Sequence, residues 1–321
     1  MEILPVRNPF VPAALRYVDQ VARSGSIQQA ARELRVAASA IDRQILLLEQ
    51  DLGVELFERR PRGMRLTASG EAIVGLIRRW RMEERRAVAE IRRLQGIQQG
   101  HARLFAMDSH ATGLLPRLVE QVAASHPFIS LDIEIGSPDE AAPALVGGRA
   151  DIAIAFNLPP RRDLEVLWRA DLPFGCVVAP GHPLARGASV SLQEISSHPV
   201  VLQSRSLAIR RFLDAQYGWL FADPKGRIET NSLQLMKQLA CSGRYALITS
   251  ELDAAPELVS GALRFIPVRD TGAEPQSISV AVEAKGLDSV VRLVASAAVA
   301  CVTACLAEVR AVGAPQAASG A

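Results

Sequence analysis

Apolar residues recur at helical spacing in three short stretches near the start of the chain. Leu15, Val18 and Ala22 form the first stripe, which ends at Gly25. Ser26 and the glutamine three positions later have the form of a capping box and predict a second, short helix that ends near Leu34. A third stripe, stopped by Gly53, consists of Ile41, Ile45, Leu48 and Leu52. Two helices at a tight corner, followed by a third, predict a helix-turn-helix.

The residues after the third stripe alternate between apolar and polar types, as in a strand. The stretch 54–59 can pair across a Pro-Arg-Gly turn with residues 64–66, which predicts a β-hairpin. Its basic residues, with only Glu58 beside them, are Arg59, Arg60, Arg62 and Arg65. Such arginines can bind the phosphates of a nucleic acid. Binding is favoured because each phosphate that an arginine neutralises releases condensed counterions. A solvated arginine-rich loop is the alternative, but the position directly after a helix-turn-helix favours a DNA-binding wing.

A long segment without proline follows from Ala68 to Gln99, and Thr67 can cap its start. As a helix it would contain about 30 residues and extend about 45 Å. An apolar seam along it, interrupted only by Glu84, consists of Ile73, Ile77, Trp80, Ala87, Ile91 and Leu94. A single chain would leave this seam in water, so the pattern predicts dimerisation through these residues. A helix packed on the chain's own second domain is the alternative.

Residues 15–70 resemble the DNA-binding domain of the LysR-type transcriptional regulators at many positions in one register. The matching residues are Leu15-Arg16-Tyr17, Gly25-Ser26, Ala30-Ala31, Leu34-x-Val36, Arg43-Gln44-Ile45, Leu48-Glu49, Leu52-Gly53-Val54-x-Leu56-Phe57-Glu58-Arg59 and Arg65-Leu66-Thr67-x-x-Gly70. The resemblance implies a winged helix-turn-helix head at residues 10–67 that binds double-stranded operator DNA, and a dimerising linker helix at residues 68–99. The candidate DNA-binding residues are Ser26, Gln28, Ala38, Ser39, Asp42, Arg43, Gln44, Arg59, Arg60, Arg62 and Arg65.

The chain departs from the family pattern where DNA is read. Members usually begin the recognition helix with Ser-Gln and carry a serine directly before the arginine, whereas this chain has Ala37-Ala38 and Asp42. An alanine methyl can only touch a thymine methyl, and Asp42 would repel phosphate unless it accepts from a cytosine amino group. Arg43 and Gln44 remain as readers of bases or phosphates. The departures predict either an altered operator preference or weaker binding that the wing compensates.

Length and charge agree with this organisation. With 321 residues, of which 49% are hydrophobic, the chain is long enough for two or three domains. Residues 1–100 hold 17 arginines and 12 acidic residues, a net charge of +5, whereas residues 101–321 hold 19 basic and 22 acidic residues, a net charge of −3. The half that faces DNA is the positive one, although the asymmetry is too modest to establish the assignment alone.

Beyond residue 100, predicted strands at 101–106, 129–135, 151–156 and 175–179 alternate with helices. Such alternation predicts parallel sheets with crossovers, which bind ligands at the carboxyl ends of their strands. This half resembles the effector-binding domain of the same family, which has the two-lobed fold of type 2 periplasmic solute-binding proteins. The matching residues are Leu114-Leu115-Pro116, His126-Pro127, Gly148-Arg149-Ala150-Asp151-Ile152-Ala153-Ile154, Gly181-His182-Pro183-Leu184-Ala185 and Asn231-Ser232-Leu233.

The resemblance implies an effector-binding domain at residues 100–312, with lobe I at about 101–172 and 268–310 and lobe II at about 173–267. Residues 313–321 are rich in Gly, Pro, Ser and Ala, and we expect a disordered tail there. The predicted fold class is therefore multidomain: an all-α winged helix-turn-helix head, a long linker helix and an α/β two-lobed periplasmic-binding-protein-like domain.

Residues 108–112 match the family's effector loop and precede a helix whose free N–H groups favour an anion such as a carboxylate. Arg205 could pair a carboxylate through two hydrogen bonds. The candidate effector-binding residues are Ser109, His110, Thr112, Asn157, Gln203, Arg205, Thr230 and Asn231. For each residue an ordinary helix cap or loop hydrogen bond is the alternative. The expected effector is a small carboxylate or aromatic acid.

Other chemistries find little support in the residues. The five histidines lack metal-ligand spacing, so we expect no metal site. Cys301 and Cys305 have apolar neighbours and predict buried structural thiols. A redox disulfide between Cys176 and Cys241 is disfavoured, because Cys176 lies in mid-strand and neither thiol has an adjacent basic residue. Without a catalytic triad, a phosphate loop or a poised carboxylate pair, we expect neither an enzyme nor a cofactor.

Targeting segments are not evident. No stretch near the N-terminus has the pattern of a signal peptide, and the longest apolar run, residues 293–307, is too short and too rich in alanine to span a bilayer. We therefore expect a cytoplasmic protein without a membrane partner, and a packed helix at residues 293–307.

These patterns together predict a LysR-type transcription factor that forms a homodimer, or a tetramer, and responds to a small-molecule effector. An effector can act only by binding one arrangement of the assembly more tightly than another. A stand-alone solute-binding protein would leave the first 100 residues unexplained, and a constitutive architectural DNA-binding protein with a vestigial cleft is a further alternative. The effector's identity, the target promoters and the sign of regulation stay open.

Overall fold

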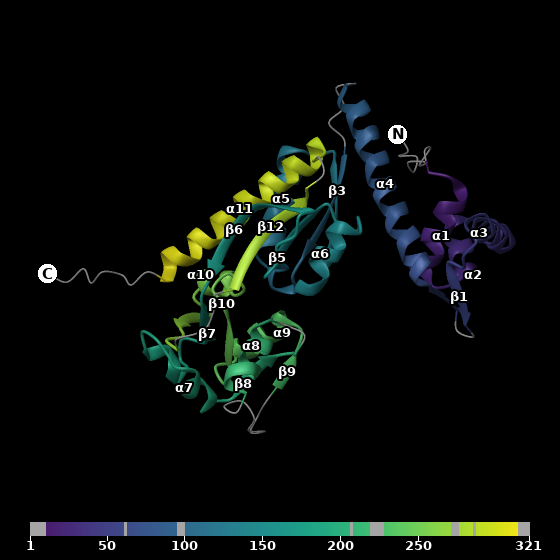
Figure 1. Ribbon diagram of the computed structural model, residues 1–321. Helices are drawn as coiled ribbons and strands as arrows, with labels where there is room; N and C mark the ends of the chain where they lie inside the picture. The colour runs from purple at the N-terminus through teal and green to yellow at the C-terminus, as the bar shows by residue number, and fades with distance from the viewer. Residues whose placement is uncertain are drawn as a thin grey trace. The chain divides into compact units, whose positions relative to one another are not determined.

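A computed structural model describes residues 11–60, 63–94, 100–205, 208–218, 228–270, 276–284 and 287–313. The contacts within the chain divide it near Ile97 into an N-terminal head with its long helix and a larger C-terminal unit (Figure 1). The end of the predicted linker helix, Arg62 in the wing and residues 314–321 of the predicted tail lie outside the described residues.

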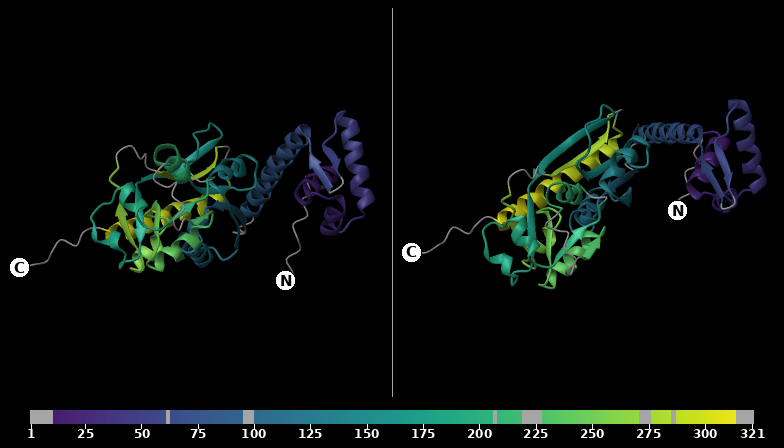
Figure 2. Two further views of the ribbon diagram at one scale, coloured as in Figure 1. Left: turned by 90° about the horizontal axis from the view of Figure 1, so that it is seen from below. Right: turned by 60° about the horizontal axis from the view of Figure 1, so that its bottom comes forward.

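The head is a winged helix-turn-helix, which confirms the prediction for this part of the chain (Figure 2). Its elements are α1 (Ala13–Ser24), α2 (Ile27–Leu34), α3 (Ala38–Leu52), β1 (Phe57–Arg60), β2 (Gly63–Leu66) and α4 (Ala68–Leu94). The capping box is only half formed. The Ser26 hydroxyl accepts from the Gln29 N–H, but the Gln29 side chain donates to Glu33 at 3.0 Å. The left-handed conformations of Gly25 and Gly53 end α1 and α3.

The first strand of the wing begins three residues later than its alternating pattern predicted. The reason is Glu49 of α3, whose Oε1 accepts from the N–H groups of Leu56 (2.7 Å) and Phe57 (3.2 Å). The backbone before β1 is thus held by a helix side chain and not by a partner strand. β1 then pairs with β2 in antiparallel register from Phe57–Leu66 to Arg60–Gly63.

The first turns of α4 are part of the head. Val74 and Ile77 are buried in one apolar cluster with Val18, Val21 and Ile45. Arg78 and Arg81 of α4 pair with Asp19, a buried carboxylate of α1. The predicted dimer seam is therefore corrected at its start, because Ile77 is fully buried within its own chain and Ile73 packs against the same cluster. Trp80, Ala87 and Ile91 of the seam are exposed.

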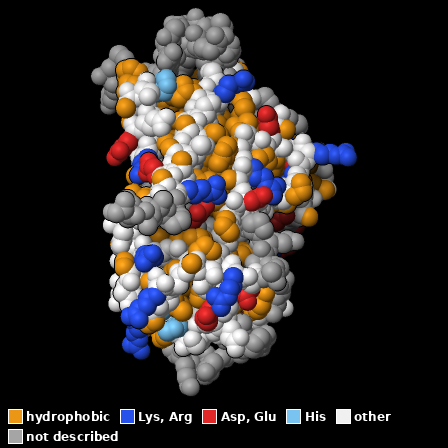
Figure 3. All heavy atoms as spheres, turned by 90° about the vertical axis from the view of Figure 1, so that its left-hand side faces the viewer, with side chains coloured by type: hydrophobic (Ala, Val, Ile, Leu, Met, Phe, Trp, Pro, Cys, Tyr) orange, Lys and Arg blue, Asp and Glu red, His pale blue; other side chains and the backbone are white. Residues whose placement is uncertain are grey.

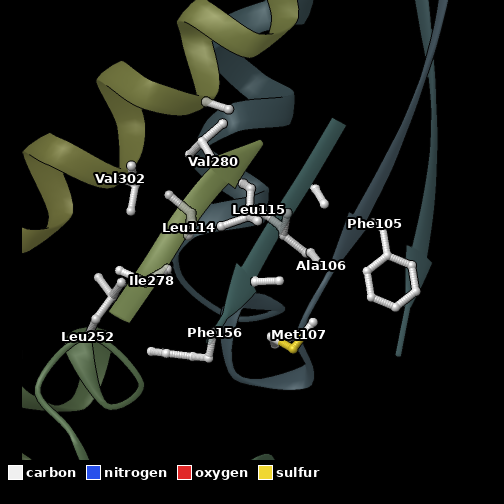
Figure 4. Packing of buried hydrophobic residues seen from close by; sticks show 14 of the residues in the cluster. Phe105, Ala106, Met107, Leu114, Leu115, Phe156, Leu252, Ile278, Val280 and Val302 are labelled. Atoms are coloured by element: carbon white, nitrogen blue, oxygen red, sulfur yellow. The ribbon is translucent and has the colours of Figure 1, made fainter. Parts of the chain in front are cut away.

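Lobe I of the C-terminal unit is a five-stranded sheet in the order β4-β3-β5-β12-β6, covered by helices. Its elements are β3 (Gly100–Ala106), the short helix η1 (Asp108–His110), α5 (Leu114–Ser125), β4 (Ile129–Ile135), α6 (Pro138–Val146), β5 (Ile152–Phe156), β6 (Leu164–Leu172), β12 (Gln276–Glu283) and α11 (Ser289–Gly313). Phe105, Met107, Phe156, Ile278 and Val302 belong to its core (Figure 4).

Lobe II is a second five-stranded sheet in the order β11-β7-β10-β8-β9. Its elements are β7 (Phe174–Val178), η2 (Pro183–Arg186), α7 (Leu192–Ser196), β8 (Val200–Gln203), α8 (Ala208–Tyr217), β9 (Ile228–Thr230), α9 (Leu233–Cys241), β10 (Ala246–Ser250), α10 (Ala255–Val259) and β11 (Arg264–Pro267). The chain thus passes from the end of β6 into lobe II and returns to lobe I in β12.

The predicted parallel pairing with crossovers is present in both sheets, but each sheet also contains antiparallel pairs and is therefore mixed. β3 pairs in parallel with β4 and β5, as expected, but β12 runs antiparallel to β5 and β6. In lobe II, β7 runs antiparallel to β10 and β11. The antiparallel strands are those next to the two crossings between the lobes, so the direction in which the chain re-enters each sheet sets their orientation.

The apolar run near the C-terminus is a packed helix, as predicted. By length and hydropathy alone, the segment Ser289–Val312 of α11 is apolar enough to cross a membrane. One of its faces is buried in the lobe I core, through Val294, Ala298 and Val302. The face of the protein drawn in Figure 3 carries acidic and basic side chains between apolar ones, with no unbroken apolar belt.

Candidate functional site

The exposed face of α3 brings several predicted DNA-binding residues together. Ser39, Arg43 and Gln44 line a shallow groove with Ala40 and with two residues of α1, Ala13 and Tyr17. Tyr17 was not among the predicted DNA-binding residues, although it lies in a motif of the first helix. Ala37, at the helix start, provides no side-chain cap. This face therefore presents one guanidinium, one amide and two hydroxyls in a small area.

The wing and α3 are joined by an ion pair that the sequence pattern did not reveal. Arg59 Nη2 donates to Asp42 Oδ1 at 2.5 Å, with side chains 57% and 36% exposed. Arg60 pairs with Glu58 at 2.7 Å and thereby lowers the pKa of that carboxyl. Asp42 thus neutralises an arginine of its own head, which resolves the repulsion that a carboxylate on α3 would otherwise exert on phosphate.

The remaining predicted DNA-binding residues lie around this face. Ser26 caps α2, Gln28 and Arg65 are exposed, and Ala38 is half-buried at the start of α3. Arg62, the last of the predicted wing arginines, lies outside the described residues.

A cavity of about 380 Å³ lies between the two lobes of the C-terminal unit. Both lobes contribute to its lining, which consists of Met107, Asp108, Ser109, Ile135, Gly136, Ser137, Pro138, Glu140, Phe156, Gln203, Ile209, Asn231, Ser232, Leu233, Asp253 and Gln276. Its volume is in the range of sites for small ligands. Met107 and Phe156 reach it from neighbouring parallel strands that end at the same edge of the lobe I sheet (Figure 4).

Three of the eight predicted effector residues, Ser109, Gln203 and Asn231, line this cavity. Thr112 and Thr230 instead make hydrogen bonds within the protein. The Thr112 hydroxyl accepts from Lys237 Nζ at 3.1 Å, and the Thr230 hydroxyl accepts from the Ser232 N–H.

Asn157 and Arg205 also make internal contacts. The Asn157 Oδ1 accepts from the Ser277 N–H at 3.0 Å, and Asn157 adopts a left-handed φ of 51°. The Arg205 side chain is 75% exposed and lies 3.5 Å from Asp214. Neither residue is part of the cavity lining, so the loop or cap alternative describes their observed contacts.

His110 lies behind the cavity wall. It is buried against Phe156, with ring centroids 5.9 Å apart, and neither ring nitrogen has a hydrogen-bond partner within the described part of the chain. Burial lowers the pKa of His110 to about 4, while Asp253 opposes this shift and Lys237 reinforces it. The ring is therefore neutral at physiological pH and cannot supply a positive charge to an anionic ligand.

Several cavity residues were missed by sequence reasoning. Asp108 was quoted within the effector loop but not chosen, whereas Asp253 follows β10 and Gln276 is the first residue of β12, and neither lies in a local motif. Only their position at the junction of the lobes brings them to the cavity. Proximity in the fold, and not spacing in the chain, is the signal that identifies them.

The four cysteines are free thiols. Burial raises the pKa of Cys176 to about 12, and burial also raises the pKa of Cys241, Cys301 and Cys305. Such thiols are poor nucleophiles, because the thiolate is the reactive form. Among the described residues, no group of three or more His, Cys, Asp or Glu is arranged to hold a metal ion.

Comparisons with known proteins agree with both parts of the chain. Residues 12–71 match a family described as bacterial regulatory helix-turn-helix protein, lysR family, and residues 95–300 match the LysR substrate binding domain. A probable RuBisCO transcriptional regulator of Synechocystis sp. is 26% identical over 275 residues, covering 82% of this chain and 78% of that protein. A probable nitrogen assimilation transcriptional activator of Synechococcus elongatus is 29% identical over 241 residues, covering 74% and 76%.

Solved structures share the fold at low identity. ArgP from Mycobacterium tuberculosis superimposes with a TM-score of 0.63 at 18% identity, covering 91% of this chain and 97% of that one. Full-length CbnR complexed with its target DNA superimposes with a TM-score of 0.57 at 20% identity, covering 91% and 98%.

The Asp42–Arg59 pair predicts how the head responds to removal of the carboxylate. Asp42→Ser frees Arg59 for a phosphate, so the slope of log K against log salt should steepen by about one unit in a fluorescence anisotropy titration with DNA. Asp51→Ser, at the other end of α3, removes the same charge but leaves Arg59 paired. Equal slopes for the two variants would contradict the role given to the pair.

His110 predicts a pH dependence of stability. Because its folded pKa of about 4 lies below the ordinary 6.5, the unfolded chain takes up the proton first as the pH falls. The free energy of unfolding should therefore decline as the pH falls from about 6.5 to about 4, and His110 should contribute about 3 kcal/mol to this decline. Below that range the contribution of His110 should stay constant.

Urea unfolding of His110→Leu from pH 7 to pH 4.5 should show a smaller decline than the parent chain does. His126→Leu, which replaces a histidine nearer the surface, should leave the decline as it is. The interpretation is wrong if His110→Leu and the parent chain lose stability equally.

Proposed function

The chain belongs to the LysR family of bacterial regulatory proteins, and from this premise we propose that it binds operator DNA through the head and responds to a small molecule in the inter-lobe cavity. It is a transcriptional regulator with an effector-binding domain, in a family of regulators and not of enzymes. The observation that carries the proposal is one polypeptide with a basic winged head and a cavity. The lining of this cavity includes two buried polar atoms, Ser109 Oγ and Gln276 Nε2, that have no partner among the described residues.

In this proposal, α3 enters the major groove, where Arg43, Gln44 and Ser39 meet base edges or phosphates. The wing arginines contact the flanking backbone. Full-length CbnR, which shares the fold, is complexed with its target DNA in its solved structure, and this supports the same use of the head here. The proposed bounds remain 10–67 for the head, 68–99 for the linker helix and 100–312 for the effector domain.

The effector would act on the contact between the lobes. The backbone oxygen of Asp108 in lobe I accepts from Gln234 Nε2 at 2.9 Å, and its Oδ2 accepts from the Gln234 N–H at 3.2 Å. A ligand beside Asp108 touches both walls, so it can favour one relative position of the lobes. That preference can alter DNA binding only if the two positions bind DNA differently.

The more specific expectation is that the effector is a carboxylate or an aromatic acid. The cavity lining supports the aromatic part of this expectation. Phe156, Met107 and Ile209 offer an apolar wall for a ring. For the acid group, the described lining offers hydroxyls and the start of α9, but no Lys, Arg or His.

The alternatives explain less of the chain. A stand-alone solute-binding protein would have no use for the head, and a constitutive architectural protein would have no use for buried, unpartnered polar atoms at a cavity.

We propose that the regulator is cytoplasmic, and that it is a dimer joined along the exposed part of α4, with a tetramer as the further possibility. Trp80 and Ile91, which are 47% and 50% exposed, would be covered in that assembly.

DNase footprinting of the intergenic DNA beside the protein's own gene tests the proposal. A panel of small acids, neutral compounds and amines is added to the bound protein, and at least one compound should alter the footprint. Asn231→Trp should fill the cavity and abolish that response while DNA binding persists. Gln193→Trp, on the exposed side of α7, should keep the response. A footprint that no compound changes would refute effector control.

Ile91→Asp tests the dimer. The substitution places a charge in the exposed part of the seam, so the mass in solution measured by light scattering should fall towards that of a monomer. Ala72→Asp, an exposed site at the start of α4 and outside the seam, should leave the mass unchanged. Ile77 is not suitable for this test, because it lies in the core of the head and its loss would destabilise that unit by about 2–5 kcal/mol. An unchanged mass for Ile91→Asp would remove α4 as the interface.

A further inference from the structure

The cavity between the lobes is lined by acidic side chains. Asp108, Glu140 and Asp253 all contribute to it, while none of its described lining residues is Lys, Arg or His. The carboxylates come from both lobes: Asp108 and Glu140 from lobe I, and Asp253 from the turn after β10 of lobe II. Any occupant therefore meets negative groups on more than one side.

Two of these carboxylates each engage one oxygen internally. Asp108 Oδ2 accepts from the Gln234 N–H and the Ser232 hydroxyl. Asp253 Oδ2 accepts from the Thr249 hydroxyl at 2.6 Å and the Ser250 hydroxyl at 2.8 Å. Within the part of the chain that is described, the Oδ1 atoms of Asp108 and Asp253 accept no hydrogen bond, which leaves acceptors for a donor on a ligand.

Two further residues of the cavity lining, Ser109 and Gln276, each carry a buried polar atom that a ligand could satisfy. Among the described residues, Ser109 Oγ and Gln276 Nε2 have no hydrogen-bond partner, and both residues are more than nine-tenths buried. An amide Nε2 can only donate, and leaving it unpaired costs about 1–3 kcal/mol. A ligand that completes this site therefore also carries an acceptor, such as a carbonyl or hydroxyl oxygen.

Two buried cations of lobe II, Lys237 and Arg210, are already paired with carboxylates. Lys237 is fully buried and pairs with Glu257 at 2.9 Å. Arg210 is 1% exposed and bonds to Asp214 and Glu229. Arg205 lies outside the lining. A carboxylate ligand would thus be desolvated beside Asp108 and Asp253 without a Lys, Arg or His partner in the described lining. The lining hydroxyls and the start of α9, where Asp108 already accepts from the Gln234 N–H, do not offset that cost.

We propose that the effector of this cavity is a small organic cation, a protonated amine that donates to Asp108 and Asp253 and carries an oxygen acceptor for Gln276 and Ser109. This inference rests on the proposed function, because it specifies the ligand class of the same cavity. The rest of the molecule packs on Met107, Phe156 and Ile209, and the volume of about 380 Å³ limits it to a small metabolite.

A thermal-shift screen of the full chain tests the ligand class. The compounds form sets of equal size on shared carbon skeletons as amine, amide and carboxylate, for example 2-phenylethylamine, phenylacetamide and phenylacetate, together with amino alcohols and hydroxy acids. Binding is assigned to the cavity when Asn231→Trp abolishes the shift and Gln193→Trp retains it. We expect the cavity-bound compounds to be amines, with the matched carboxylates inactive.

Variants of the carboxylates test the contact itself. Asp108→Asn removes the charge but keeps an oxygen that can accept from α9, so the fold is preserved. An amine should bind about tenfold more weakly to Asp108→Asn, which corresponds to the loss of one charge-assisted hydrogen bond. Asp253→Asn should have the same effect. Asp171→Asn, an exposed carboxylate on β6 outside the cavity, should change the affinity by less than twofold.

The outcomes separate this inference from the proposed function. Carboxylates or neutral compounds as the main cavity ligands would overturn the cationic class while leaving effector control intact. Amine binding that Asp108→Asn and Asp253→Asn do not weaken would also overturn it. The absence of any cavity ligand among all three charge classes, with an unchanged footprint, would overturn both.

Discussion

The docking of the first turn of α9 on the loop after β3 is the contact on which the cavity depends. The Asp108 carboxylate accepts from the Gln234 N–H and the Ser232 hydroxyl at the start of α9 in the opposite lobe, and the Asp108 backbone oxygen accepts from the Gln234 side chain. A few residues further on, Lys237 reaches Thr112 at 3.1 Å and Glu257 at 2.9 Å. These polar contacts fix the separation of the walls and thereby the size of the space between them.

Charge pairing explains the chemistry of both functional surfaces. Around the cavity, Lys237 and Arg210 are held by carboxylates, so the positive charge that a cleft for acids would need is used to hold the fold together. In the head, Asp42 and Glu58 similarly bind Arg59 and Arg60. A count of arginines in the wing thus overstates the charge available for phosphate, because two of them have acidic neighbours at 2.5 and 2.7 Å.

The long helix α4 serves two purposes along its length. Its first turns close the core of the head through Val74 and Ile77 and hold α1 through Asp19. Further along, Trp80 and Ile91 are exposed. The apolar seam of α4 has one regular spacing in the sequence but two parts in the structure. Its first residues lie in the core of the head, and its later residues are exposed. Only the exposed part is available to another chain. The division also places the head at a defined position on its own helix.

The sequence by itself determined the local structure. Helical stripes, the Ser26 cap, Gly25 and Gly53 specify the three helices of the head, because caps, left-handed glycines and apolar spacing act within a few residues. The wing, the four predicted strands and the packed C-terminal helix follow for the same reason. Ser109, Gln203 and Asn231 were selected because they lie near the ends of predicted elements, and in the structure all three line the cavity.

Tertiary structure decided everything that depends on partners distant in the chain. The antiparallel course of β12, the burial of Ile77, the pairing of Asp42 with Arg59 and the arrival of Asp253 and Gln276 at one cavity have no local signature. Each arises from residues brought together by the fold, and a charge or an apolar side chain has the same appearance in the sequence whether it is paired, buried or free. The sequence could not show for this reason that the cavity is acidic, because Lys237 and Arg210 look available in the sequence but are paired with carboxylates in the fold.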